Sequence, residues 1–117
     1  MQFSEDQEMR FTEGDCWLLA LEMQALEPRL RVAVIGDRSV GSVDDWIHVG
    51  VCTENGLFMD IYGVYDDANA LKDRWGRTEF ALVPEGQEKY WFADCEPCWE
   101  ASRRDVRRVA EELLNLL

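Results

Sequence analysis

Three side chains in the first half of the sequence have the types and spacing of a nucleophile, a base and an orienting acid. Cys16 stands where an apolar helix is expected to begin. His48, the only histidine of the chain, and Asp60 lie in a stretch with strand-like alternation. A helix N-terminus favours thiolate, an imidazole can take the thiol proton, and a carboxylate can fix the tautomer of that ring. This combination is typical of nucleophilic catalysis by cysteine.

The helix that would carry Cys16 is predicted over residues 16–27, and Pro28 ends it. Its side chains are apolar around most of the circumference, so we expect a central, buried helix. Asp15 is expected to cap this helix by accepting from its first N–H groups. The backbone N–H groups of Cys16 and Trp17, being among the unpaired donors of the first turn, are the candidates for an oxyanion hole.

Residues 45–64 are predicted to form a β-hairpin that brings His48 and Asp60 to the same face. Successive strand side chains alternate between faces. The aliphatic residues of both strands therefore share a face only if the turn has three residues and ends with Gly56 in the left-handed conformation. Gly50 then stands opposite Asp60, and His48 is a diagonal neighbour at about 7–8 Å between backbones. The hydrophobic pattern alone predicts that the imidazole reaches the carboxylate.

The rest of the chain predicts a single α+β domain over residues 1–117, with a central N-terminal helix packed on a largely antiparallel sheet and a C-terminal helix. Residues 1–13 are expected to be a loose, acidic lead-in. The C-terminal helix is expected from Ser102, with Asp105 as its capping-box partner. The other expected elements are a strand at 29–37, a polar loop before the hairpin, a helix at 66–76, and strands within 78–86 and 89–94.

The composition makes several classes of partner improbable. The formal net charge is −12, from 24 acidic and 12 basic residues. Such a surface repels nucleic-acid phosphates and anionic membranes, so we expect no direct nucleic-acid or membrane partner. It suits a basic partner, and the acidic clusters that would meet one are Glu5–Asp6, Asp44–Asp45, Asp66–Asp67 and Glu111–Glu112. Four cysteines and a start without a basic, then apolar, signal predict a reducing cytoplasm, or a host cytoplasm for a phage-encoded chain.

The motifs "DC" at Asp15–Cys16, "HVGV" at 48–51 and "LFMDIYG" around Asp60 resemble the papain-like cysteine peptidase superfamily, in particular its NlpC-type and transglutaminase-like branches. In NlpC-type enzymes a "DC" dipeptide begins the helix, a strand of the form "HVGI" follows, and a third polar residue lies on the next strand. The resemblance covers residues 11–76 and extends to small bacterial and phage proteins of this kind. It implies a minimal papain-like domain with Cys16 as nucleophile, His48 as base and Asp60 as orienter.

These residues lead to the hypothesis of a thiol hydrolase or acyltransferase that acts on a peptide or amide bond of a peptide or protein substrate, without cofactor or metal. The alternative is an acidic inhibitor or adaptor that uses the fold as a scaffold. It would block a basic site on a host protein, for example a nucleic-acid-binding defence complex such as CRISPR. For Cys16 alone, a buried core thiol is the simplest alternative.

Two further cysteines, Cys95 and Cys98, form the motif "CEPC". A C-x-x-C pair is half a zinc site or a redox pair. Cys52 could add a third ligand, but a second pair is missing, so we favour two incidental thiols in a turn.

Overall fold

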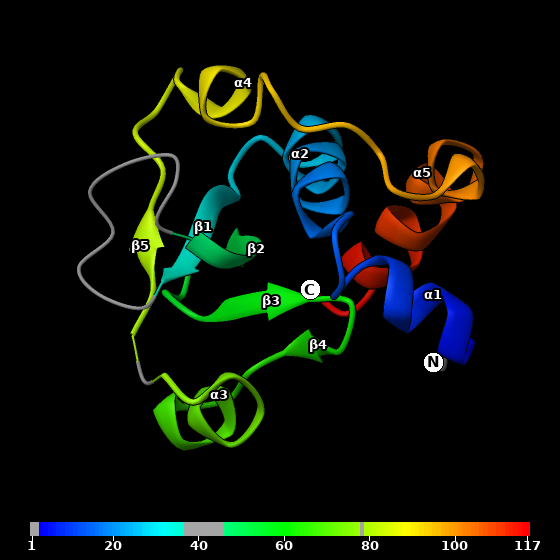
Figure 1. Ribbon diagram of the computed structural model, residues 1–117. Coiled ribbons are helices and arrows are strands. Elements are labelled where there is room, and N and C mark those ends of the chain that lie inside the picture. The colour runs from blue at the N-terminus through cyan, green and yellow to red at the C-terminus, as the bar shows by residue number, and fades with distance from the viewer. Residues whose placement is uncertain (1–2, 37–45, 78) are drawn as a thin grey trace.

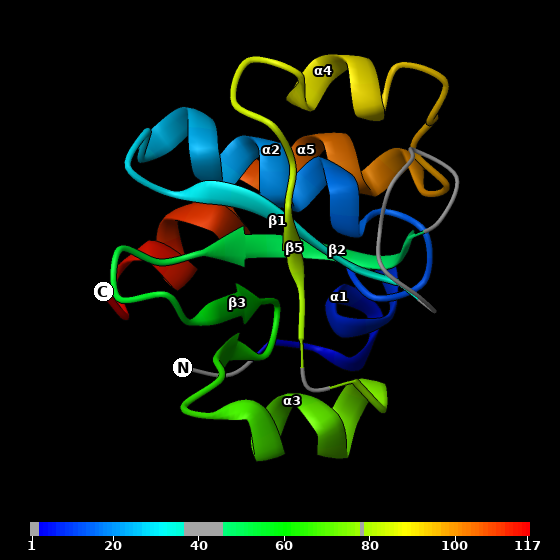
Figure 2. The ribbon, with the colours of Figure 1, turned by 90° about the vertical axis from the view of Figure 1, so that its left-hand side faces the viewer.

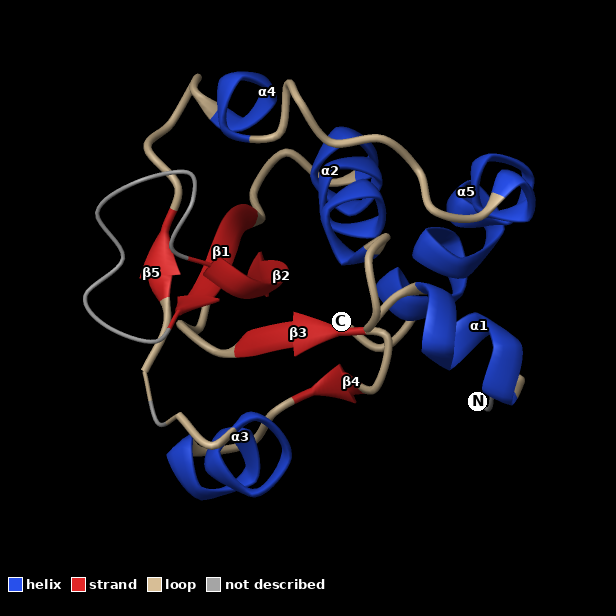
Figure 3. Cartoon of the chain, in the orientation of Figure 1, coloured by secondary structure: helices blue, strands red, loops and turns tan. Residues whose placement is uncertain are grey.

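The structure is a computed structural model that describes residues 3–36, 46–77 and 79–117. Its strands form one open antiparallel sheet of five strands in the order β4-β3-β2-β1-β5. Helices surround this sheet (Figure 3), which confirms the α+β class. The elements are α1 (Glu5–Arg10), α2 (Cys16–Leu26), β1 (Arg31–Gly36), β2 (Trp46–Cys52), β3 (Phe58–Asp60), β4 (Gly63–Val64), α3 (Ala68–Trp75), β5 (Ala81–Leu82), α4 (Glu88–Trp91) and α5 (Glu100–Leu114).

Helices cover both faces of the sheet. Figures 1 and 2 show α2 and α5 on one side of the strands and α3 on the other. The larger buried cluster lies on the α2 side and joins Cys16 and Met23 to Val49 and Val51 of β2. The smaller cluster lies on the α3 side and is built around Phe58, Tyr65 and Leu71, with Ala33, Ile35 and Cys52. Strand β2 therefore separates two apolar layers.

The central helix begins at Cys16, as the sequence predicts, but Asp15 does not cap it. The Asp15 side chain makes no capping hydrogen bond to α2 and is fully buried. Its carboxylate accepts a hydrogen bond from the backbone N–H of Cys98 at 2.7 Å. A buried carboxylate is cut off from water and needs hydrogen-bond donors from the protein. The Asp15 carboxylate therefore ties the segment before α5 to the start of α2.

The hairpin register agrees with the prediction. Cys52 pairs with Phe58, and Gly56 has a φ of 82°, the left-handed conformation expected at the end of a three-residue turn. If the same register is continued along both strands, Gly50 stands opposite Asp60. The helix expected after the hairpin is α3; Asp67 caps it, and Gly76, with a φ of 74°, ends it.

The N-terminal segment differs from the expected loose lead-in. Residues 5–10 form helix α1, because Ser4 and Gln7 make a complete capping box. Arg10, at the end of this helix, pairs with Asp105 of α5 at 2.9 Å. Asp105 is therefore an ion-pair partner within α5, which begins at Glu100, and not a residue of the cap.

The region between α3 and α5 contains less strand than the alternation predicts. In the described range 79–86, the strand is limited to Ala81–Leu82, which pairs with β1, and the Val83 N–H adds a hydrogen bond to the Val32 carbonyl. The second predicted strand, 89–94, overlaps helix α4 and the turn after it. The polar loop before the hairpin, with Asp44–Asp45, lies outside the described residues. None of the helices in the described ranges is both long and apolar enough to cross a bilayer.

Candidate active site

His48 and Asp60 are in direct contact, as the hairpin register predicts. The imidazole Nε2 lies 2.8 Å from Asp60 Oδ2. Both side chains are inaccessible to solvent, with exposed fractions of 0 % and 2 %. A carboxylate in such a site needs hydrogen-bond donors. Asp60 has two besides the imidazole: the backbone N–H of Tyr62 at 2.9 Å and the hydroxyl of Tyr65 at 2.8 Å.

The tautomer of His48 follows from this network. The indole Nε1–H of Trp75 donates to the Tyr65 oxygen at 3.0 Å, so the Tyr65 hydroxyl hydrogen is directed to Asp60. Burial, and then the charge of Asp60, raise the pKa of Tyr65 well above its ordinary value, so this hydroxyl keeps its proton. An ionised Asp60 can only accept, and His48 therefore donates to it from Nε2. The other ring nitrogen, Nδ1, is left unprotonated.

Aromatic side chains hold the imidazole from its faces. Trp75 stacks on the His48 ring with centroids 3.8 Å apart and planes 16° apart, and the Phe58 ring lies 5.9 Å away. Sequence reasoning missed both Tyr65 and Trp75. Their one signal was position: Tyr65 follows the hairpin and Trp75 ends the next helix, so only the folding of α3 over the sheet brings them to His48.

Nδ1 of His48 is buried and has no hydrogen-bond partner among the described residues. A buried polar atom left unpaired costs about 1–3 kcal/mol. Such atoms are rare in native proteins, and each calls for a structural or functional reason. Because the hydrogen of the ring is committed to Asp60, this nitrogen is the one that is able to accept a proton.

The thiol of Cys16 lies against the backbone of the strand that carries His48. The backbone N–H of Val49, the residue after His48, is directed at the sulfur, together with those of Trp17 and Cys16 itself. The Cys16 side chain belongs to the cluster on the α2 side of the sheet, whereas the aromatic partners of His48 lie on the α3 side. The structure therefore brings the sulfur to the strand of the base, but not into hydrogen-bond contact with Nδ1.

Burial dominates the acidity of the thiol. It raises the pKa of Cys16 to about 12, although the N–H groups of Val49, Trp17 and Cys16 act to lower it. The expected lowering by the helix N-terminus is therefore present but outweighed. At neutral pH the group is a thiol, and a thiolate requires a proton acceptor inside the site. Transfer to Nδ1 would leave the summed charge of Cys16, His48 and Asp60 at −1, so it avoids the cost of burying a new net charge.

The buried thiol predicts a loss of stability at alkaline pH. The unfolded chain loses the Cys16 proton near the ordinary pKa of 9.0, whereas the folded chain holds it to about 12. This contribution to the free energy of unfolding is therefore full below about pH 9 and falls as the pH rises towards 12. Between pH 8 and pH 10.5, urea unfolding should show a larger fall in the free energy of unfolding for the parent than for Cys16→Ala. Equal falls in the two proteins would contradict the buried, protonated thiol.

Replacing Tyr65 by phenylalanine is expected to lower the free energy of unfolding by about 1–3 kcal/mol. The change leaves the Trp75 N–H without its acceptor and removes one of the three donors to Asp60. The matched control is Tyr90→Phe, because Tyr90 is 74 % exposed and should tolerate the change within about 0.5 kcal/mol. Urea denaturation measures both; equal effects of the two substitutions would refute the network.

The remaining cysteines form no metal site in the described part of the chain. No group of three or more potential ligands comes together there. Cys52 lies in the cluster on the α3 side, Cys95 is half-buried and Cys98 is exposed. Burial raises the pKa of Cys95, and the neighbouring charges of Asp94 and Cys98 add to this. The zinc alternative through these three cysteines therefore has no support.

Comparison with known proteins adds no further constraint on the site. No family model, no curated protein and no solved structure matches this chain. The geometry of Cys16, His48 and Asp60 is therefore the basis for assigning a function.

Proposed function

We propose that the protein is a small papain-like cysteine hydrolase or acyltransferase that acts on a peptide or amide bond. The observation that carries the proposal is the buried Nδ1 of His48, which has no hydrogen-bond partner in the described part of the chain, in a ring whose Nε2 is held by Asp60. The thiol that would use this nitrogen lies against Val49, the next residue of the same strand. Nucleophilic catalysis needs a base that reaches the nucleophile and a third group that orients the base. Asp60 orients the base, and catalysis requires a local movement that brings the Cys16 thiol to Nδ1.

The reaction would proceed in two stages. The Cys16 thiol gives its proton to Nδ1 of His48 as the sulfur attacks the carbonyl carbon and a tetrahedral intermediate forms. The N–H groups of Cys16 and Trp17 face the sulfur and supply donors for the oxyanion. The C–N bond then breaks, and the leaving amine takes the proton from Nδ1. Water, or an acceptor amine, attacks the resulting thioester and regenerates the thiol.

Access to the sulfur requires local movement, since Cys16 is only 2 % exposed. The segment around Cys98 lies beside the start of α2, where its backbone is hydrogen-bonded to Asp15. We therefore expect substrate binding to be linked to a displacement of side chains around this helix terminus, and turnover by the isolated protein to be slow.

Turnover of fluorogenic acyl-amide substrates tests this function, with covalent capture of the acyl group read by mass spectrometry. The parent should accumulate one acyl group on Cys16 and release the amine. Cys16→Ala should lose both signals. Cys98→Ala removes an exposed thiol of the same type and should retain both. Acylation that moves to other cysteines, or amine release that survives Cys16→Ala, would refute the proposal.

The second candidate function, an acidic inhibitor or adaptor, has one specific observation in its favour. Acidic side chains at Glu5, Asp6, Asp66, Asp67 and Glu111 are exposed, and the net charge is −12. Binding to a basic protein that weakens with salt and survives Cys16→Ala would favour this candidate. Activity that is abolished by Cys16→Ala would favour the enzyme.

A further inference from the structure

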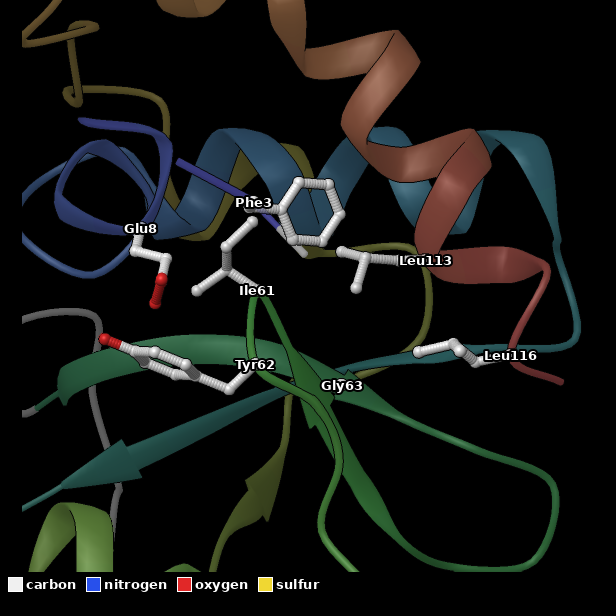
Figure 4. A pocket seen from close by; sticks show the side chains of 7 residues that line it. All are labelled: Phe3, Glu8, Ile61, Tyr62, Gly63, Leu113 and Leu116. Atoms are coloured by element: carbon white, nitrogen blue, oxygen red, sulfur yellow. The ribbon is translucent and has the colours of Figure 1, made fainter. Parts of the chain in front are cut away.

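A cavity of about 210 Å³ opens between α1, α5 and the turn from β3 to β4. Figure 4 shows Ile61 from this turn beside Leu113 of α5 and Phe3, which precedes α1, while Tyr62 and Gly63 complete the lining on the strand side. Leu116 also lines the cavity. None of these residues belongs to the candidate triad, although the Tyr62 backbone also donates to Asp60.

The two ends of this cavity differ in chemistry. Figure 4 shows the carboxylate of Glu8 and the hydroxyl of Tyr62 together at one end, with the apolar side chains of Phe3, Ile61 and Leu113 along the rest. Within the described part of the chain, the Glu8 carboxylate makes no hydrogen bond or ion pair, although its backbone C=O accepts from Thr12. Among the described residues, the cavity thus presents a carboxylate without an ion-pair partner next to an apolar wall.

The Tyr62 ring is fixed by a cation from the neighbouring helix. The guanidinium of Arg74 lies over this ring, 3.5 Å from its centroid. Such a contact holds an aromatic side chain in place when it is partly exposed, and Tyr62 is 39 % exposed. The hydroxyl next to Glu8 is therefore presented in a defined position and can accept a hydrogen bond from a bound group.

We propose that this cavity binds a basic side chain, lysine or arginine, of a partner peptide or protein. The long aliphatic stem of such a residue would lie on Ile61, Leu113 and Leu116, since basic side chains bury their stems along apolar surface and keep the charge at a polar rim. Its cation would pair with Glu8 and hydrogen-bond to Tyr62. The charge of −12 draws basic partners towards the molecule. The site does not depend on the proposed hydrolase activity.

NMR titration of the isotope-labelled full chain tests the site, with Ac-Gly-Lys-Gly-NH₂ as probe and the same peptide with norleucine in place of lysine as its uncharged match. The lysine peptide should shift the resonances of Tyr62, Leu113 and Leu116 and bind roughly 2- to 5-fold more tightly, the range of a partly exposed ion pair. Glu8→Gln should abolish this preference. Glu13→Gln, at an exposed position outside the cavity, should leave it intact.

Three results would overturn the proposal. They are equal affinity for the two peptides, an unchanged preference in Glu8→Gln, and shifts that map away from the cavity. Leu116→Ala tests the apolar wall separately and should lower the affinity for both peptides alike. Unchanged affinity would show that the aliphatic stem does not lie on Leu116. Cys16→Ala should bind like the parent, so a failed enzyme assay would leave this result untouched.

Discussion

Replacing Asp60 by asparagine is expected to move the proton of His48 from Nε2 to Nδ1. In the parent protein the Asp60 carboxylate accepts hydrogen bonds from His48 Nε2, from the Tyr65 hydroxyl and from the Tyr62 backbone N–H. An amide keeps the shape but presents one NH₂ group. The Tyr62 N–H requires the acceptor oxygen at the Oδ1 position, so the NH₂ group takes the Oδ2 position, where it faces Nε2 and the Tyr65 oxygen. The imidazole then avoids two opposed donors by changing tautomer. Nδ1 then carries a hydrogen and cannot accept the thiol proton.

The tautomer change can be read directly, because the chain has a single histidine and its ¹⁵N ring signals need no assignment. We expect the parent to show the Nε2–H form and Asp60→Asn the Nδ1–H form. The proposed activity should fall by about 10²–10⁴-fold, the scale of losing an orienting carboxylate. Asp66→Asn changes an exposed carboxylate on the same segment and should alter neither. An unchanged Nε2–H tautomer in Asp60→Asn would contradict the network.

Replacing Gly50 by alanine is expected to lower the free energy of unfolding by about 3 kcal/mol or more, at the upper end of overpacking effects. A Cβ at this position would lie 2.5 Å from the Met59 carbonyl oxygen and 2.8 Å from Phe58 Cε2. The first atom is backbone and the second belongs to a buried ring, so neither can give way. The Phe58 ring covers Gly50 and also packs near His48, and we therefore expect the imidazole to be displaced as well.

The comparison variant for Gly50→Ala is Gly76→Ala. Gly76 has open space around the position of a Cβ, but a φ of 74°, so its replacement should cost about 1 kcal/mol through backbone strain alone. Urea denaturation gives both values. A Gly50→Ala protein as stable as Gly76→Ala would show that β2 and β3 are not packed as closely as described.

The contact between His48 and Asp60 was predictable because one face of the hairpin is apolar. A strand has a period of two, so a slip by one residue would expose the whole aliphatic set. Only the turn ending at Gly56 keeps both strands in phase, and that register brings the imidazole to the carboxylate. Alternation and turn chemistry are local properties, which is why the sequence carries them.

The residues that complete the site depend on tertiary packing. Nothing in the sequence near Tyr65 or Trp75 indicates that α3 folds over β2, and the acidity of Cys16 depends on how much protein covers it. Asp15 precedes a helix, which predicts a cap, but its carboxylate accepts from the backbone N–H of Cys98 instead. The strand predicted at 89–94 failed for a related reason: its apolar residues pack on α2, through Trp17 and Phe92, without joining the sheet.

The central claim is that Cys16 is a nucleophile served by His48, and competitive alkylation of the native protein with iodoacetamide tests it most directly. At neutral pH, peptide mapping should show Cys16 modified more slowly than the exposed Cys98, because burial keeps it a thiol, but well above the rate of global unfolding. His48→Ala should lower the Cys16 rate to that of global unfolding and leave the Cys98 rate unchanged. If Cys98 reacts freely while Cys16 is modified only at the rate of global unfolding, then Cys16 is an inert core thiol and the account is wrong.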